Sequence, residues 1–206
     1  MRGKVGIMGG TFDPVHIGHL ILGESAYTQF GLDRVLFMPS GNPPHKQKRD
    51  GATNDQRVDM VRLAIRGNPH FELSLEEMHE DGYTYTKETL KRLTGENPDT
   101  DYFFIMGADS LFDFDDWMCP DEIAKLCTIV VAVRDGLPTQ KLDDEIQRVS
   151  RKYHADIRKL SSPNLDISSH MIRRWVREGG SIRYYVPEAV REYIQENGVY
   201  TCSTIS

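Results

Sequence analysis

Short apolar runs alternate along the chain with amphipathic stretches of helical spacing. Lys4–Met8 is an apolar run closed by two glycines, which predicts a buried strand. Ile17–Phe30 carries apolar residues at helical spacing, and Gly31 follows as a stop signal. Thr128–Val133 is the clearest strand of the chain by its content of β-branched residues. The pattern therefore predicts an alternation of strands and helices.

The same two signals, apolar spacing and the glycines and prolines that interrupt it, predict the other elements. Further strands are expected at Arg34–Met38, Phe71–Leu75, Asp101–Met106 and Ile157–Leu160. Further helices are expected at Asp55–Ile65, Lys87–Leu93, Asp121–Cys127, Leu142–Tyr153 and Ser169–Arg177, and from Pro187, as first helical residue, to Glu196. Strands separated by helices indicate βαβ crossovers. We therefore expect an α/β fold with a doubly wound, mainly parallel sheet covered on both faces, in a single domain over residues 1–206.

Composition narrows the classes of function. The 206 residues carry 25 Lys and Arg against 31 Asp and Glu, a net charge of −6, which argues against general nucleic-acid binding. No apolar run approaches the roughly 18 residues that cross a bilayer, and the first residues lack the features of a signal peptide. Cys119, Cys127 and Cys202 form no C-x-x-C pair, which indicates a reducing compartment and predicts a cytoplasmic protein.

The turn after the first strand is the strongest candidate for chemistry, because ligands of parallel sheets bind beyond the carboxyl ends of the strands. Gly9 and Gly10 allow close approach of the backbone, and the helix that follows presents its N-terminus. These features predict a phosphate-binding turn. Its sequence is neither that of a P-loop nor that of a dinucleotide-binding fingerprint, which disfavours kinases and dehydrogenases.

Two histidines, His16 and His19, lie three residues apart at the start of this helix, on one side of its first turn. Gly18 between them removes a Cβ where we expect a ligand to press on the backbone. A single histidine here would more often be packed or capping. A zinc site needs further ligands, for which His45 is the nearby candidate. The pair is best interpreted as donors to phosphate oxygens.

Two sequence motifs carry a resemblance to a known family. Residues 10–19, G-T-F-D-P-V-H-I-G-H, resemble the signature of the nucleotidylyltransferase superfamily, and residues 167–173, I-S-S-H-M-I-R, resemble its second motif. Residues 43–46, 107–110 and 131–134, together with Tyr85-Thr86 and Trp117, resemble the bacterial nicotinate-nucleotide adenylyltransferases in order and spacing. The resemblance covers nearly the whole chain and implies a Rossmann-like nucleotidylyltransferase fold.

The resemblance implies transfer of AMP from ATP to nicotinate mononucleotide, which gives deamido-NAD and pyrophosphate in NAD biosynthesis. The nucleophile is then an ionised phosphate, so no general base is needed, and we expect direct in-line attack without a covalent intermediate. Mg²⁺ would be carried mainly by the ATP phosphates, with no protein metal ligand expected. The implied partners are these two small molecules, not nucleic acid or a membrane, and a homo-oligomer is left open.

The resemblance also assigns roles to individual residues. The expected catalytic residues are His16, His19, Lys46 and Arg173, with His19 stabilising the transition state. The expected ATP- and phosphate-binding residues are Gly9, Gly10, Thr11, Arg134, Ser169, Gly107, Asp109 and Ser110. The expected nicotinate-binding residues are Tyr85, Thr86 and Trp117, with Trp117 stacking on the pyridine ring.

Several of these residues have simpler interpretations. Lys46 lies in the long loop Ser40–Asn54 among other cations and could be a surface charge, Trp117 a core aromatic and Ser169 a plain N-cap. The acidic cluster at residues 113–116 is more typical of a solvated turn than of a metal site. The chain also departs from the family pattern, with His170 in place of a common Thr and Asp135 in place of a common Pro.

Other functions share parts of this pattern. The nearest alternatives are nucleotidylyltransferases that use nicotinamide mononucleotide, phosphopantetheine or a cytidylyl group. The letters H-I-G-H also occur in class I aminoacyl-tRNA synthetases, but this chain has no K-M-S-K-S segment. A further alternative is a module that binds ATP without turnover. The pair Tyr184-Tyr185 suggests either an interface or a packed core pair.

Overall fold

A central parallel sheet organises the chain in a computed structural model, which describes residues 2–41, 51–78, 85–133 and 139–201. The strands are β1 (Gly3–Gly10), β2 (Arg34–Pro39), β3 (Phe71–Leu73), β4 (Thr100–Gly107), β5 (Thr128–Ala132) and β6 (Ile157–Leu160). They form a 6-stranded sheet in the order β3-β2-β1-β4-β5-β6, and every neighbouring pair is parallel. The predicted doubly wound sheet of Rossmann type is therefore confirmed.

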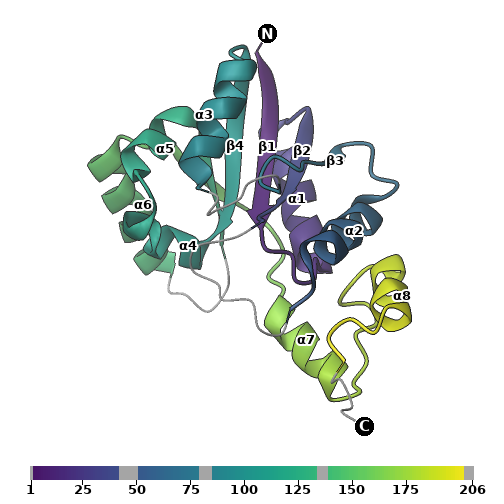
Figure 1. Ribbon diagram of the computed structural model, residues 1–206. Helices are drawn as coiled ribbons and strands as arrows, with labels where there is room; N and C mark the ends of the chain where they lie inside the picture. Colours follow the sequence, from purple (N-terminus) through teal and green to yellow (C-terminus); the bar gives the residue numbers. More distant parts are fainter. Residues whose placement is uncertain (1, 42–50, 79–84, 134–138, 202–206) are drawn as a thin grey trace.

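Helices connect the strands and cover both faces of the sheet. They are α1 (Ile17–Phe30), α2 (Asn54–Ile65), α3 (Thr86–Glu96), α4 (Ala108–Phe112), α5 (Pro120–Leu126), α6 (Thr139–Tyr153), α7 (Ser169–Arg177) and α8 (Glu188–Glu196), with a 3₁₀ turn η1 (Phe114–Asp116). In Figure 1, α1 and α2 lie to the right of the sheet and α3, α5 and α6 to its left, while α7 and α8 lie below it.

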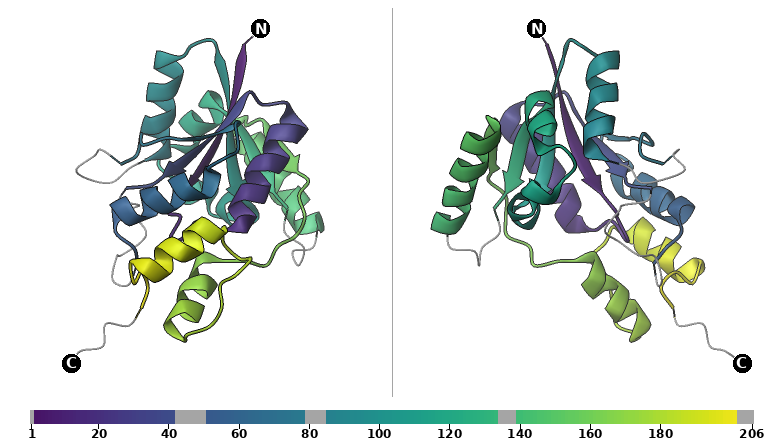
Figure 2. Two further views of the ribbon diagram at one scale, coloured as in Figure 1. Left: turned by 90° about the vertical axis from the view of Figure 1, so that its right-hand side faces the viewer. Right: turned by 60° about the vertical axis from the view of Figure 1, so that its left-hand side comes forward.

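Side chains of alternate strand residues enter two separate cores. In β1, Ile7 packs with α3 to α6 in one core, whereas Met8 packs with α1, α2, α7 and α8 in the other. In the left view of Figure 2, α1, α2 and α8 lie on the side of the strands that faces the viewer. The sheet is thus buried on both faces, which explains why its strands are nearly continuous apolar runs.

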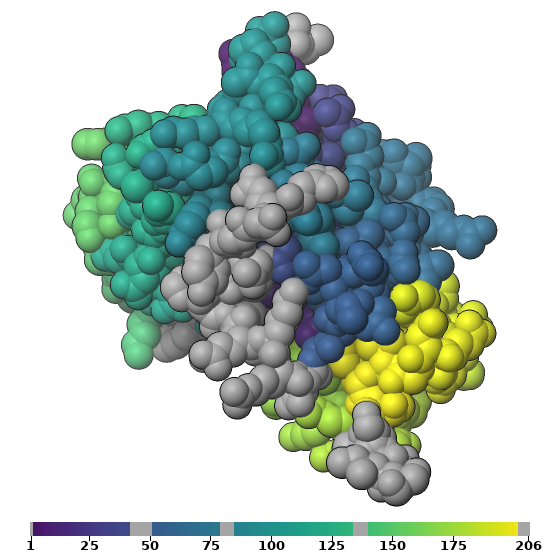
Figure 3. Space-filling view, viewed as in Figure 1, coloured from purple at the N-terminus to yellow at the C-terminus, as the bar shows by residue number. Residues whose placement is uncertain are grey.

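The last two helices share the second of these cores with the sheet. Ile172 of α7 and Val190 and Ile194 of α8 are buried in it. The surface of α8 adjoins that of α2, which Figure 3 shows as yellow beside blue. Helices α7 and α8 thus pack in the same core as α1 and α2, and the single domain over residues 1–206 stays a prediction. No helix in the described part of the chain is both long and apolar enough to cross a membrane.

Most predicted elements differ from the observed ones only at their ends. Ile17–Phe30, Ile157–Leu160 and Ser169–Arg177 have the predicted bounds. Pro187 precedes the last helix as its N-cap and is not its first helical residue. The pattern did not predict α4 and η1, since five and three residues are too short to display helical periodicity.

Candidate active site

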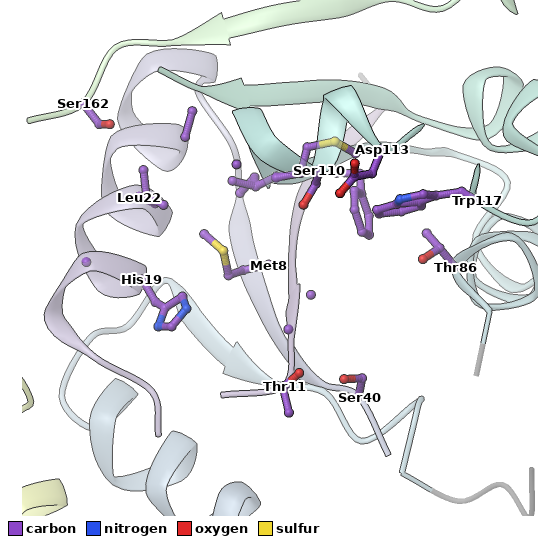
Figure 4. A pocket seen from close by; sticks show the side chains of 18 of the residues that line it. Met8, Thr11, His19, Leu22, Ser40, Thr86, Ser110, Asp113, Trp117 and Ser162 are labelled. Atoms are coloured by element: carbon purple, nitrogen blue, oxygen red, sulfur yellow. The ribbon is translucent and has the colours of Figure 1, made fainter. Parts of the chain in front are cut away.

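A cavity of about 920 Å³ opens at the carboxyl ends of the strands. The turn after β1 and the start of α1 form one wall, and the segment from β4 through η1 forms the opposite wall. Figure 4 shows His19 on one side and Trp117 on the other, with Met8 between them and Thr11 and Ser40 at one end. The cavity therefore joins the phosphate-binding turn predicted from sequence to the predicted nicotinate pocket.

The turn after β1 is held in shape by a buried aromatic ring. Phe12 has a φ of 48° and is 2% exposed, and its ring lies under the backbone of Gly10. The same ring meets His19 edge-on, with centroids 5.0 Å apart. Phe12 thus fixes both the turn and one face of a predicted catalytic histidine. A left-handed φ at a bulky residue is rare and persists only where packing imposes it.

The two histidines of the first motif lie against each other. Their rings stack with centroids 3.7 Å apart, and both residues line the cavity. The backbone N–H of His16 donates to Nδ1 of His19 at 3.2 Å. Because Nδ1 accepts this bond, the neutral ring of His19 carries its proton on Nε2, as a donor to an anionic ligand requires.

The first turn of α1 leaves one backbone donor for a ligand. The N–H of Ile17 donates to the carbonyl of Tyr185, and that of His19 to the carbonyl of His16. Among the described residues, the N–H of Gly18 has no acceptor, and Gly18 lines the cavity. This donor lies at the positive end of the helix dipole, so it favours an anion.

A side chain at Gly18 would crowd the neighbouring histidine. An added Cβ would lie 3.0 Å from Nδ1 and 3.1 Å from Cε1 of His16, so it would press on the histidine ring. The glycine therefore makes room for the stacked imidazoles. Gly107 differs from Gly18, because a Cβ added at Gly107 would have no neighbouring atom within 4 Å.

The opposite wall contains the predicted nicotinate-binding residues. The Trp117 ring meets Phe104 edge-on at 5.9 Å and Phe114 at 5.6 Å, which fixes its plane while the residue still lines the cavity. Tyr85 and Thr86 line the cavity where α3 begins. Gly107 and Ser110, at the start of α4, line it as well. The structure thus brings the predicted nicotinate residues together in one wall.

Three predicted phosphate-site residues lie outside the lining of the cavity. Asp109 is exposed on α4. The Ser169 hydroxyl donates to the carbonyl of Pro14 at 2.8 Å, and Ser168, not Ser169, is the N-cap of α7. Arg173 Nη1 donates to the carbonyl of Asp13 at 2.6 Å. In this structure the second motif therefore bonds to the backbone of the first.

Two predicted phosphate-binding cations, Lys46 and Arg134, lie outside the described residues, as do His45 and Asp135. Among the described residues that line the cavity, His16 and His19 are the only side chains able to carry a positive charge. Glu77, Asp113 and Asp116 add carboxylates to the lining. The described part of the cavity therefore depends on imidazole and backbone donors to bind an anion.

The pattern missed one wall segment, which follows the last strand. Ser162, Pro163, Asn164 and Leu165 line the cavity and are contributed by the loop after β6. The rule that ligands bind at carboxyl ends of parallel strands applies to β6 as well as β1, and it would have predicted this segment. The described residues contain no group of three His, Cys, Asp or Glu side chains able to hold a metal ion.

The acidic cluster at residues 113–116 is tied to a neighbouring helix through Asp115. Asp115 accepts hydrogen bonds from Lys152, Tyr153 and Arg148, and these bonds lower the pKa of its carboxyl group well below the usual range. It therefore joins η1 to α6.

The two residues of the pair Tyr184-Tyr185 have different surroundings. Tyr184 is 84% exposed, whereas Tyr185 packs edge-on against Trp175 with ring centroids 4.7 Å apart.

Comparisons with known proteins agree with this geometry. Residues 7–175 match the family described as Cytidylyltransferase-like. A probable nicotinate-nucleotide adenylyltransferase of Lachnoclostridium phytofermentans is 45% identical over 197 residues, covering 96% of this chain and 98% of the relative. Another of that name, from a Thermoanaerobacter species, is 42% identical over 200 residues, covering 96% and 94%. The solved structure of the Plasmodium falciparum nicotinic acid mononucleotide adenylyltransferase complexed with NaAD is similar, with a TM-score of 0.80 at 18% identity, covering 97% of this chain and 98% of that one.

Proposed function

The chain belongs to the cytidylyltransferase-like family and, within it, to the nicotinate-nucleotide adenylyltransferases, and we propose how its cavity performs that reaction. The protein is a nucleotidyltransferase of NAD biosynthesis that transfers AMP from ATP to nicotinate mononucleotide. The residues that act in this transfer, and the path of the reaction, are our inference from the geometry.

One observation carries the assignment of roles. The donor nitrogen of His19 and the Gly18 N–H belong to the same turn of α1, and Trp117 lies across the same cavity. A triphosphate bound at the turn and a pyridine ring at Trp117 would then approach each other within the cavity. This arrangement suits a reaction that joins two nucleotides through their phosphates.

The transfer we propose is direct and in line. The phosphate of nicotinate mononucleotide is ionised at neutral pH, so it attacks the α-phosphorus of ATP without a general base, and pyrophosphate leaves. His19 Nε2 donates to the oxygens on which charge increases in the transition state, with Thr11, Gly9 and Gly10 lining the same wall. Denatured protein that retains radiolabelled AMP would contradict this path, because it would reveal a covalent intermediate.

The other phosphate contacts that we propose come from beyond this turn. We propose that Lys46 and Arg134 neutralise phosphate charge, and that Ser169 and Arg173 act at the β- and γ-phosphates from the start of α7. Support for Arg173 is its half-buried guanidinium, held at the first motif by Asp13. We propose that Gly107, Asp109 and Ser110 bind the adenosine, since α4 begins at the cavity edge.

Mg²⁺ would enter with ATP. It prefers phosphate and water oxygens to a cage of protein ligands, so the triphosphate and water would supply most of its ligands. Bound in this way it would supply charge neutralisation on the triphosphate. We also propose a cytoplasmic location, in keeping with the free thiols of Cys119 and Cys127.

Preference for the acid over the amide form of the substrate follows from the start of α3. Tyr85 is the N-cap of this helix without a side-chain cap bond, and both Tyr85 and Thr86 line the cavity. The positive end of a helix dipole stabilises a carboxylate more than a neutral amide. We therefore propose that nicotinate mononucleotide binds with its carboxylate at this helix end.

The test is pyrophosphate release from Mg·ATP with nicotinate mononucleotide, nicotinamide mononucleotide and phosphopantetheine in parallel. We expect turnover with the first acceptor and a lower kcat, at little changed affinity for ATP, in His19→Ala. His70→Ala is the matched control. His70 directly precedes β3, stacks on Tyr27 and does not line the cavity. ATP binding without release with any acceptor would favour a nucleotide-binding module instead.

A further inference from the structure

A buried arginine lies behind the phosphate-binding turn. Arg57 is on α2, is 1% exposed and does not line the cavity. Its Nη1 donates to the carbonyl of Thr11 at 2.5 Å, and its Nη2 donates to the carbonyl of Ser40 at 2.7 Å. Nη2 also meets Asn54 Oδ1 at 2.8 Å and the carbonyl of Gly41 at 3.4 Å. One guanidinium thus bonds to four groups.

These acceptors come from separate segments of the chain. Thr11 follows β1, Ser40 and Gly41 follow β2, and Asn54 begins α2. Thr11 and Ser40 both line the cavity at the same end. Because the guanidinium is rigid and planar, its two terminal nitrogens fix the spacing between the carbonyl groups of Thr11 and Ser40. A change in this spacing would displace the turn that we propose binds the triphosphate.

The charged guanidinium of Arg57 is buried, and most of its hydrogen-bond partners are neutral backbone carbonyl groups. Within the described part of the chain, no carboxylate lies within 4.0 Å of the guanidinium, so backbone carbonyls supply most of its hydrogen bonds. Burial lowers the pKa of Arg57, and the nearby Asp13 and Tyr200 partly offset that effect. A buried charge held mainly by carbonyl groups is costly, and it indicates a role that an apolar side chain could not fill.

We propose that Arg57 is a positioning residue for AMP transfer, which acts by fixing the turn at Thr11 relative to the loop at Ser40. The proposal rests on the function proposed above. Arg57 touches neither nucleotide in this scheme. Its loss would therefore misplace the reacting phosphates more than it would weaken their binding, because a displacement of about 1 Å costs roughly 100-fold in rate. The effect should appear mainly in kcat.

Arg57→Lys is the principal variant, because it keeps the charge and fits the space but provides one nitrogen where arginine provides two. Arg57→Ala removes the group and allows rescue by added guanidinium ion, with urea as the neutral analogue. Val61→Ala is the matched control for stability, since Val61 lies on the same helix, is fully buried and does not line the cavity. Arg62→Ala controls for loss of an exposed arginine from that helix.

The assay is pyrophosphate release with both substrates varied, together with thermal unfolding of each variant. We expect kcat of Arg57→Lys to fall by roughly 10- to 100-fold, with KM for ATP changed by less than about threefold. Val61→Ala should keep kcat near the wild-type value at temperatures where it is folded. Guanidinium ion, but not urea, should restore part of the activity of Arg57→Ala.

Two results would overturn the inference: a kcat of Arg57→Lys within about twofold of wild type, or an equal loss of kcat in Val61→Ala at matched thermal stability. If Arg57→Ala does not fold, the comparison of Arg57→Lys with Val61→Ala decides the question alone. Failure of the wild-type protein to release pyrophosphate contradicts the proposed function instead. The two failures are thus separate in one experiment.

Discussion

Removal of a single hydroxyl group from Tyr200 tests how the C-terminal segment stabilises the site. Tyr200 is 8% exposed, and its hydroxyl donates to Asp13 Oδ1 at 2.7 Å. Asp13 belongs to the first motif, and the same oxygen accepts the N–H of Ala52 at 2.9 Å. Tyr200→Phe keeps the ring and removes the bond to the carboxylate, together with a weak contact of the hydroxyl with Met60 Sδ at 4.0 Å.

The expected cost follows from the surroundings of the bond. A buried hydrogen bond to a charged group contributes about 1.5–3 kcal/mol. We expect the lower half of this range, because Ala52 still donates to Asp13 after the change. For a domain of this size each kcal/mol lowers Tm by about 2–4 °C.

The pH dependence of this difference has a definite sign. Burial, and then the charge of Asp13, raise the pKa of Tyr200 far above its usual range in the folded protein. The unfolded chain ionises this tyrosine near its usual pKa, about 10, so it binds fewer protons than the native state above that pH. The contribution of Tyr200 is therefore complete below about pH 10 and is lost above it, at about 1.4 kcal/mol per pH unit.

Urea unfolding of wild type and Tyr200→Phe from pH 8 to pH 11 measures both effects. Other tyrosines with raised pKa values, such as Tyr102 and Tyr193, are present in both proteins and cancel in the difference. Tyr184→Phe is the matched control, because Tyr184 is 84% exposed and should change neither quantity. A stability difference between wild type and Tyr200→Phe that stays constant above pH 10 would refute the reasoning.

Three further substitutions test individual contacts. Gly51→Ala should destabilise the fold by about 1–3 kcal/mol in urea unfolding, because its Cβ would overlap the fixed carboxylate of Asp13. Gly18→Ala should lower kcat without lowering Tm, since its Cβ would lie 3.0 Å from the His16 ring, and an unchanged kcat would contradict this. Trp117→Leu should raise KM for nicotinate mononucleotide by roughly 2- to 10-fold and leave KM for ATP unchanged, if its ring stacks on the pyridine.

The main elements of the fold could be predicted because their signals are local. The helix Ile17–Phe30 has apolar residues at helical spacing and a left-handed Gly31, with φ of 59°, directly after it. The strands are buried on both faces and are therefore apolar runs that stand out from the helices. Helix α4 has only five residues and was missed, because its stability comes from Ala108 and Leu111 packed in the core and not from a repeated pattern.

The part of the candidate site that its own residues indicate, without the family resemblance, lies in one short segment. The turn from Gly9 to His19 is that segment, and it lines the cavity as expected. The loop from Ser162 to Leu165 also lines the cavity, but it follows β6, the strand at the edge of the sheet. The position of this loop is determined only by the pairing of β5 with β6. No local signal indicates that this loop is close to His19 in space.

The burial of Arg57 could be predicted from the sequence, whereas its hydrogen-bond partners could not. It precedes Met60 and Val61 by three and four residues, so it lies on the apolar face of its own helix, and both of those residues are fully buried. A charged residue on that face must meet hydrogen-bond acceptors inside the protein, because water does not reach it. The helical pattern could therefore have shown that Arg57 is buried and bonded. It could not have shown that its acceptors are Thr11 and Ser40, since these belong to turns after two other strands. Their identity depends on the parallel register of β1 and β2, which places Gly10 beside Pro39 and so brings the two turns together within reach of one guanidinium.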